Sequence, residues 1–174
     1  LKNRVARVYI PYHLASECKH EIPETDTELF LSLPVIMRSE TAPKMNLIRD
    51  LLQSNSFDGV QISSVSALNW LKNIQYSGKI AFDHRIYIWN RETYEHWESR
   101  FDTYCTPLEL NRRELFRLPL QGKEVMVYGR VPMMVTANCI KKTTGCCGSN
   151  LKYLTLTDRY QADFPVRTDC VFCY

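Results

Sequence analysis

The segment FDGVQISSVSALNWLKNIQYSGKIAF (residues 57–82) decides the fold. Its first part, FDGVQIS, is typical of a short buried strand, and KIAF at its end begins another strand. Between them, SVSALNWLKNI predicts a helix whose inward face carries Val65, Leu68, Leu71 and Ile74. A strand, a helix and a strand in direct succession indicate a parallel sheet that is covered by helices.

The same alternation continues on both sides of this segment. Further strands are predicted at 4–12, 28–37, 101–110 and 123–136, and further helices at 39–54, 91–100 and 111–118. These strands are too few for a complete eight-stranded α/β barrel, which takes about 250 residues. We therefore expect residues 1–135 to form an α/β fold that is part of a (β/α) barrel of the TIM type. A small open α/β sheet is the alternative.

The composition is that of an ordinary globular chain, 45% hydrophobic and 24% charged, with a net charge of +3. This mild positive charge allows an anionic partner without requiring one. No apolar run approaches the ~20 residues of a membrane-spanning helix, and the beginning LKNRVARVYI lacks the pattern of a signal peptide. The sequence thus predicts a cytoplasmic protein that has no membrane partner.

After Thr136 the sequence becomes polar and rich in cysteine. Five of the seven cysteines lie in NCIKKTTGCC (138–147) and in DCVFCY (169–174). The segment between these two groups, 151–167, has the pattern of two strands joined by a tight turn. Because the two ends of a β-hairpin are neighbours in space, the two cysteine groups are expected to meet. Residues 136–174 are therefore predicted to be a cysteine-rich, metal-binding hairpin segment.

Four of these thiols are predicted to bind one metal centre: Cys139, Cys146, Cys170 and Cys173. Four thiolates suit a tetrahedral zinc ion and also a [4Fe–4S] cluster, and the spacing alone does not separate the two. Cys147 is an alternative to Cys146, because adjacent cysteines rarely both bind one metal. Cys18 and Cys105 lie outside the cluster and are expected to be free thiols.

Glycines and lysines within the first cysteine group favour such a centre. Gly145 and Gly148 allow the loop to bend closely around a metal. Lys141 and Lys142 are expected to lower the pKa of the thiols and to offset the negative charge of four thiolates.

Two segments, VMVYGRVPMMVTANCIKKTTGC (125–146) and YLTLTDRYQADFPVRTDCVFCY (153–174), closely resemble the collagenase-like peptidase family of unassigned catalytic type. Weaker matches upstream extend the resemblance over nearly the whole chain, as a middle-to-late part of a long member. The resemblance implies an incomplete (β/α) barrel with a cysteine-ligated site. By position, the four predicted ligands fall where long members carry cysteines, whereas Cys147 departs from the pattern.

Several members of that family hold a [4Fe–4S] cluster and hydroxylate transfer RNA, ribosomal RNA or ubiquinone precursors without oxygen, some with prephenate as the hydroxyl donor. The resemblance therefore implies an iron–sulfur-dependent hydroxylase that acts on an RNA base, with a prephenate-like donor as a further partner. Other members are recorded as peptidases, so a collagenase-like protease with structural cysteines is the alternative. A third hypothesis is an RNA-binding module that is held together by zinc. The chain lacks G-x-S-x-G and H-E-x-x-H motifs, which argues against a hydrolase.

Candidate catalytic residues follow the predicted strands. Glu109 and Asn111 lie where a strand ends, at the edge where barrel enzymes carry their active sites. A carboxylate there can take or give a proton, while Asn111 also suits the N-cap of the next helix. Arg130 can bind a carboxylate or phosphate of a substrate, or pair with Glu109 or Asp158. His84 is expected to be a structural histidine rather than a base.

Basic side chains gather around the cysteine groups and can contact the phosphates of RNA: Lys141, Lys142, Lys152, Arg159 and Arg167. An ordinary solvated basic face is the alternative at this low net charge.

Overall fold

The computed structural model describes four stretches of the chain: residues 5–18, 26–53, 56–148 and 153–174. The chain divides into two compact units, Leu1–Gly129 and Arg130–Tyr174. The first is a parallel sheet with helices between its strands, and the second is an antiparallel hairpin with one short helix. The boundary expected from the sequence lies slightly further along, after residue 135.

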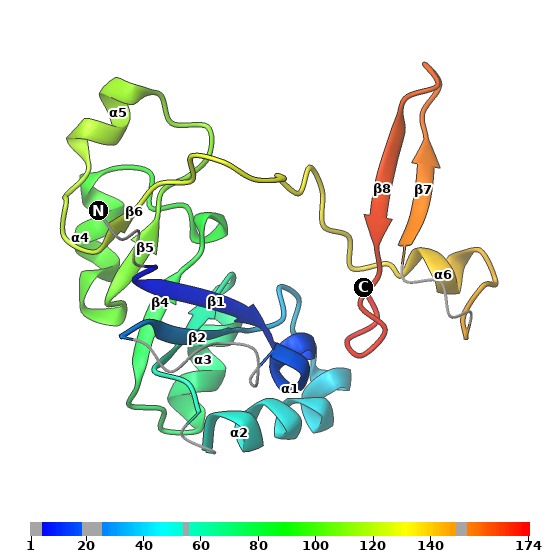
Figure 1. Ribbon diagram of the computed structural model, residues 1–174, viewed down its shortest axis with the longest axis horizontal. Coiled ribbons are helices and arrows are strands. Elements are labelled where there is room, and N and C mark those ends of the chain that lie inside the picture. The colour runs from blue at the N-terminus through cyan, green and yellow to red at the C-terminus, as the bar shows by residue number, and fades with distance from the viewer. Residues whose placement is uncertain (1–4, 19–25, 54–55, 149–152) are drawn as a thin grey trace. The chain divides into compact units, whose positions relative to one another are not determined.

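The sheet of the first unit is built from these described strands: β1 (Arg7–Pro11), β2 (Glu28–Ser32), β3 (Gly59–Ile62), β4 (Lys79–Phe82), β5 (Thr103–Cys105) and β6 (Lys123–Glu124). The strands lie in the sheet in chain order, and each pairs with its sequence neighbours in parallel. Figure 1 follows them from blue at β1 to yellow-green at β6. The prediction of a parallel α/β sheet is confirmed.

The connections between the strands carry the helices: α1 (Ala15–Cys18), α2 (Met45–Gln53), α3 (Val65–Asn73), α4 (Arg91–Trp97) and α5 (Arg112–Arg117). Short 3-10 turns accompany them: η1 (Tyr12–Leu14), η2 (Ser39–Lys44), η3 (His84–Ile86) and η4 (Glu98–Arg100). Side-chain caps explain where two helices begin, because Ser64 accepts from the amide of Ala67 and Asn90 accepts from that of Thr93. Within the described residues, no helix combines the length and the apolar character that a membrane span requires.

The core of the first unit lies between the sheet and the helices. Alternate strand residues face it, since successive side chains of a strand point to opposite sides. They are buried together with residues of α2 and α3: Ile10, Leu31, Val60, Ile62, Phe82, Met45, Ile48, Ala67 and Leu71. Val65, which was expected to face inward, is exposed. It lies two positions before Ala67, and helix positions that are two apart face different sides.

The sheet is strongly curled, and the contacts of Arg7 on β1 demonstrate this. Its guanidinium donates to Oγ1 of Thr103 on β5 at 2.8 Å and to Oε1 of Glu124 on β6 at 2.7 Å. In a flat sheet β1 and β6 would lie five strand spacings apart, ~24 Å, which one side chain cannot span. Arg7 therefore crosses the concave face of a curled half-barrel. Such a sheet is compatible with part of a TIM-type barrel.

Several strands are shorter in the structure than predicted: the strand expected at 101–110, for example, covers only β5, Thr103–Cys105. The strand expected at 28–37 ends at Ser32, just before Leu33 and Pro34, and proline cannot donate to a ladder. The strand expected at 123–136 ends at Glu124, where its pairing with the short strand β5 ends. Beyond it the apolar side chains of Val127 and Tyr128 are exposed.

The second unit consists of α6 (Ile140–Thr143) and a hairpin of β7 (Tyr153–Thr157) and β8 (Asp163–Arg167). The predicted hairpin is confirmed, and in it Tyr153 pairs with Arg167 at the open end. Residues 151 and 152 of the predicted first strand, and with them Lys152, lie outside the described residues. Among the described residues of this unit only Lys141 and Phe172 are buried, so the unit has almost no hydrophobic core.

Candidate functional site

The first cysteine group surrounds α6. Cys139 is the N-cap of this helix, and its carbonyl accepts from the amide of Thr143. At the other end the amide of Gly145 donates to Lys142, and the amide of Cys146 donates to the carbonyl of Lys141. These two bonds form a Schellman cap, in which Gly145 takes the left-handed conformation, with φ 71°. The spacing from Cys139 to Cys146 thus corresponds to one capped helical turn.

The second cysteine group lies in a closed loop that follows β8. The amide of Asp169 donates to the carbonyl of Tyr174 at 2.7 Å, and the amide of Tyr174 donates back at 3.1 Å. The side chain of Asp169 accepts from the amides of Val171 and Phe172, and Phe172 is buried. This loop therefore holds Cys170 and Cys173 on a defined backbone with both side chains exposed.

One contact joins the two cysteine groups. Nζ of Lys141, on α6, lies 3.9 Å from Sγ of Cys170. Only 3% of Lys141 is exposed, so its ammonium group is held beside the sulfur in a largely buried position. Four thiolates carry more negative charge than a divalent metal ion neutralises, and a buried cation beside a sulfur offsets part of the remainder. The charge and the donor atoms here fit a thiolate-ligated metal centre.

The thiols themselves are not gathered into a ready coordination sphere. In the described residues, no group of three or more Cys, His, Asp or Glu side chains is close enough to hold a metal ion. Cys146, Cys147, Cys170 and Cys173 are exposed free thiols, and Cys139 is half-buried. Assignment of the four ligands, and of Cys147 as the alternative to Cys146, therefore remains a prediction.

In the first unit, polar side chains gather at the carboxyl ends of β3 and β4. Asp83 is buried and accepts from Oγ of Ser63 at 2.8 Å. Nδ1 of His84 lies 2.5 Å from Oδ1 of Asp83, and Arg85 pairs with Oδ2. Because these groups satisfy Asp83 and orient His84, the contacts agree with a structural role for this histidine.

Cys105 ends β5 at the same edge and is half-buried. Burial, followed by the charges of Asp83 and Glu124, raises the pKa of its thiol to about 11. The sulfur therefore stays protonated at neutral pH and is a poor nucleophile. This argues against a cysteine-peptidase mechanism centred on Cys105.

The three predicted catalytic residues lie in different surroundings. Glu109 is exposed between β5 and α5, where its Oε1 accepts from the hydroxyl of Tyr87 at 3.2 Å. Asn111 caps α5: its Oδ1 accepts from the amides of Arg113 and Glu114, and Glu114 accepts from the amide of Asn111 in return. Arg130 is exposed at the start of the second unit. The catalytic roles of all three remain predictions.

The cap gives a direct test of Asn111. Asn111→Ala removes the acceptor of two amides at the start of α5 and is expected to lower the free energy of unfolding by about 1 kcal/mol. Asn111→Ser keeps an acceptor and is expected to retain most of the stability. Urea unfolding followed by tryptophan fluorescence measures both. If Asn111→Ser is as stable as the wild type but inactive, the residue acts in chemistry as well as in the cap.

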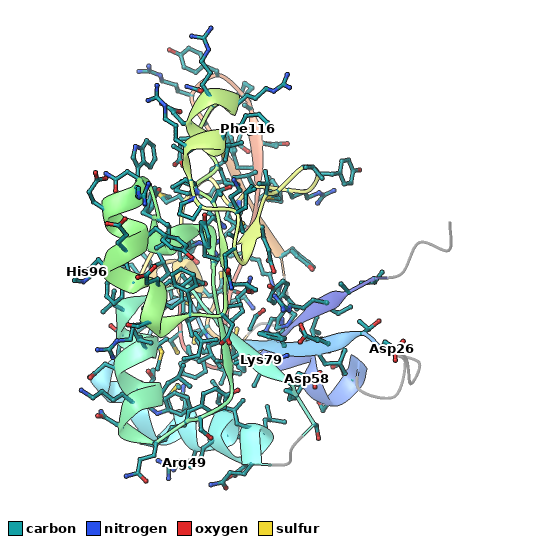
Figure 2. The ribbon with its side chains drawn as sticks, turned by 90° about the vertical axis from the view of Figure 1, so that its left-hand side faces the viewer. Asp26, Arg49, Asp58, Lys79, His96 and Phe116 are labelled. Atoms are coloured by element: carbon teal, nitrogen blue, oxygen red, sulfur yellow. The ribbon has the colours of Figure 1, made fainter. Side chains whose placement is uncertain are left out.

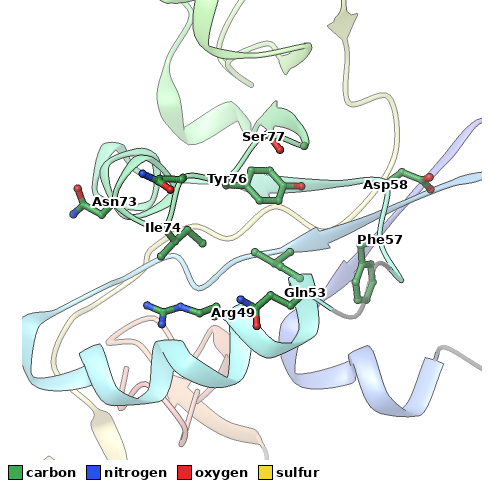
Figure 3. Close-up of a pocket in the computed structure, with 11 residues that line it drawn as sticks. Arg49, Gln53, Phe57, Asp58, Asn73, Ile74, Tyr76 and Ser77 are labelled. Atoms are coloured by element: carbon green, nitrogen blue, oxygen red, sulfur yellow. The ribbon is translucent and has the colours of Figure 1, made fainter.

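A cleft of about 590 Å³ lies at the opposite edge of the sheet. Arg49 and Gln53 at the end of α2 and Asn73 at the end of α3 line it, together with Asp58 and Tyr76 (Figure 3). Burial, then the charges of Asp102 and Asp58, raises the pKa of Tyr76 to about 12. Because this cleft adjoins the amino ends of β3 and β4, it is not where α/β barrels place their active sites.

Two features of the first unit were not predicted from the sequence. One is the charged network of Arg7, Glu28 and Glu124 on the concave face, whose members are far apart in the sequence. The other is a stacked pair of exposed rings, Tyr87 and Trp89, beside Glu109. The sequence does contain one indication of the ring pair: two aromatic residues, two positions apart, follow a predicted strand.

Comparison of the chain with protein-family models, with curated proteins and with solved structures gave no match.

Proposed function

We propose that this chain belongs to an iron–sulfur-dependent enzyme that hydroxylates an RNA base without oxygen, as its resemblance to the collagenase-like peptidase family implies. Cys139, Cys146, Cys170 and Cys173 are the proposed ligands. The observation that carries the proposal is the contact of the buried Lys141 with Cys170, which brings the two cysteine groups together in one small unit.

The weak core of the second unit supports a metal centre. Small domains that bury little apolar surface are usually held together by disulfides or by a metal. The five cysteines here are free thiols in the structure, so no disulfide fills that role. Metal binding by two cysteine-bearing turns would supply the missing stabilisation, since the binding free energy of a structural metal adds to the free energy of folding.

The first unit is proposed to be the substrate-binding part of a (β/α) barrel. In its curled parallel sheet, the connection after β5 carries the exposed Glu109 at the carboxyl ends of the strands, where barrel enzymes bind their substrates. When bound, a [4Fe–4S] cluster supplies electron-transfer chemistry. Glu109 can accept a proton or bind an N–H group of the base. For Arg130, which belongs to the second unit, the proposed role is to pair with the carboxylate of a prephenate-like hydroxyl donor.

Two measurements test this proposal. Protein purified without oxygen is expected to be brown and to contain iron and sulfide, whereas a zinc site would be colourless. Mass spectrometry of RNA from a deletion strain is expected to show the loss of one hydroxylated nucleoside. An unchanged RNA profile together with lost proteolysis would instead identify a peptidase. Colourless, zinc-loaded protein that binds RNA and leaves it unmodified would identify an RNA-binding module.

A further inference from the structure

Two aromatic rings are stacked and exposed at the carboxyl edge of the first unit. Tyr87 and Trp89 have ring centroids 6.2 Å apart and planes inclined by 28°. Tyr87 is 49% exposed and Trp89 is 44% exposed, although large aromatic side chains usually contribute to the core. Between them, Ile88 is completely buried. Ile88 thus anchors this connection in the core, while the rings on either side of it remain exposed.

The backbone at this pair is held in an unusual conformation. Tyr87 has a left-handed conformation, with φ 57°, which is uncommon for a residue other than glycine. Its amide donates to the carbonyl of His84, and its hydroxyl donates to Glu109. Such strain persists only where surrounding contacts enforce it, and it is concentrated at functional sites. The ring of Tyr87 is therefore positioned by contacts from two different connections.

Glu109 places a hydrogen-bond acceptor beside the two rings. Its carboxylate lies in the connection from β5 to α5, whereas the rings lie in the connection from β4 to α4. The hydroxyl of Tyr87 donates to Oε1, and an ionised carboxylate has room for further donors because it accepts only. The charge of Glu109 and this hydrogen bond also raise the pKa of Tyr87, so the phenol remains a donor at neutral pH.

Positive charge lies next to the same connection. Arg112, Arg113 and Arg117 are exposed on α5, which begins three residues after Glu109 in the sequence. The guanidinium of Arg112 lies 5.6 Å from the ring of Phe116, which Figure 2 labels on this helix. Exposed arginines beside an aromatic surface are typical of sites that bind single-stranded nucleic acid, through phosphates and through stacked bases.

We infer that Tyr87, Trp89 and Glu109 form a nucleobase platform, which stacks a planar base on the exposed rings and binds its N–H groups with the carboxylate. Guanine fits best, because its N1–H and its amino group offer two adjacent donors to one carboxylate. Uracil presents carbonyl oxygens on both sides of its single N–H, and these would face the negative charge. The arginines of α5 would add contacts to the phosphates of an RNA strand.

This inference assigns a base-binding site to the proposed RNA-modifying enzyme. It rests on the proposed function only in naming RNA as the partner. Binding itself requires neither a metal nor turnover. If the protein binds guanine nucleotides but deletion of its gene leaves the RNA unchanged, the platform is supported and the proposed function is wrong. The opposite result, modified RNA without nucleotide binding at this site, removes the platform and leaves the function intact.

The experiment is a titration of the complete chain with guanosine, GMP, UMP and short single-stranded RNA, followed by tryptophan fluorescence. Guanine ligands are expected to quench the fluorescence, with an affinity about tenfold higher than that of UMP. Trp89→Phe should remove the quenching, because the other two tryptophans lie on helices, Trp70 on α3 and Trp97 at the end of α4. Guanine-containing RNA should bind more tightly than guanosine and should lose affinity with added salt. Equal affinity of RNA and guanosine would overturn the role of the arginines.

Two variants test the platform residue by residue, with circular dichroism as the check on folding. Tyr87→Leu should reduce affinity about tenfold, since stacking of one base contributes about 1–3 kcal/mol. Glu109→Gln should keep stacking and lose the preference for guanine over uracil. Tyr153→Leu, which removes an exposed tyrosine of the hairpin, should change nothing. Quenching by no ligand, or a guanine preference that survives Glu109→Gln, would overturn the inference.

Discussion

Serine in place of Cys139, Cys146, Cys170 or Cys173 is expected to abolish metal binding by the second unit, whereas Cys147→Ser is expected to retain it. Four thiolates complete the coordination of one centre, and an alcohol is a poor replacement for a thiolate. Structural zinc sites contribute ~10–16 kcal/mol of apparent binding free energy, far more than a nearly coreless unit can replace. Metal content and visible absorption of anaerobically prepared protein measure the effect.

Cys147→Ser is the matched control, because Cys147 is adjacent to Cys146 and is exposed as well. Loss of metal in Cys147→Ser with retention in Cys146→Ser would show that the ligand assignment is wrong by one residue. Retention in all five variants would overturn the metal centre altogether.

Folding of the second unit should follow metal binding. Limited proteolysis is expected to cut residues 130–174 readily in metal-free protein and slowly in metal-loaded protein, because the unit buries little else.

Arg7→Met is expected to lower the free energy of unfolding of the first unit by about 3 kcal/mol. Arg7 is only 17% exposed and binds carboxylates on β2 and β6, Glu28 and Glu124, which are left without this cation in the variant. Its guanidinium also lies 4.3 Å from the ring of Phe30. Methionine preserves much of the volume, so the measured loss reports mainly the charged contacts.

Tryptophan fluorescence in urea measures this effect, because all three tryptophans, Trp70, Trp89 and Trp97, belong to the first unit. Arg91→Met is the matched control: Arg91 pairs with Glu95 one helical turn away, and both side chains are largely exposed. Its expected cost is below about 0.5 kcal/mol. Equal effects of the two variants would contradict the role of Arg7 in the concave face.

The pH dependence of stability gives a second readout of the same network. Hydrogen bonds from Lys79 and then Arg7 lower the pKa of Glu28 in the folded state. A carboxyl group with a lowered pKa stabilises the fold above its unfolded value of ~4.3, and this contribution is lost as the pH falls through the folded value. The wild type should therefore lose more stability than Arg7→Met when the pH is lowered below ~4.

Local signals predicted much of the chain correctly. The pattern of apolar residues in 57–82 is enough to show a strand, a helix and a parallel strand, and these are β3, α3 and β4. The N-cap position of Asn111 is likewise readable from the sequence, because a cap acts on amides within the first helical turn. The hairpin of the second unit was equally predictable from its turn and its alternation.

Contacts between distant residues were not predictable in this way. From the sequence, Arg7 is a polar position in the predicted strand 4–12, and only the curl of the sheet brings it to Thr103 and Glu124. Tyr87 and Trp89 follow the strand that begins with KIAF, and no local pattern predicts that the chain turns at Tyr87 and leaves both rings exposed beside Glu109.

The sequence by itself determined the order of strands and helices, their parallel arrangement and the two cysteine groups, because these depend on periodicity and spacing over short stretches. The tertiary structure alone decided which side chains meet across the concave face, which rings remain exposed, and that Lys141 lies against Cys170 rather than in solvent. Those outcomes depend on the curvature of the sheet and on the packing of loops, in which the partners are separated by many residues. No local pattern encodes such distances.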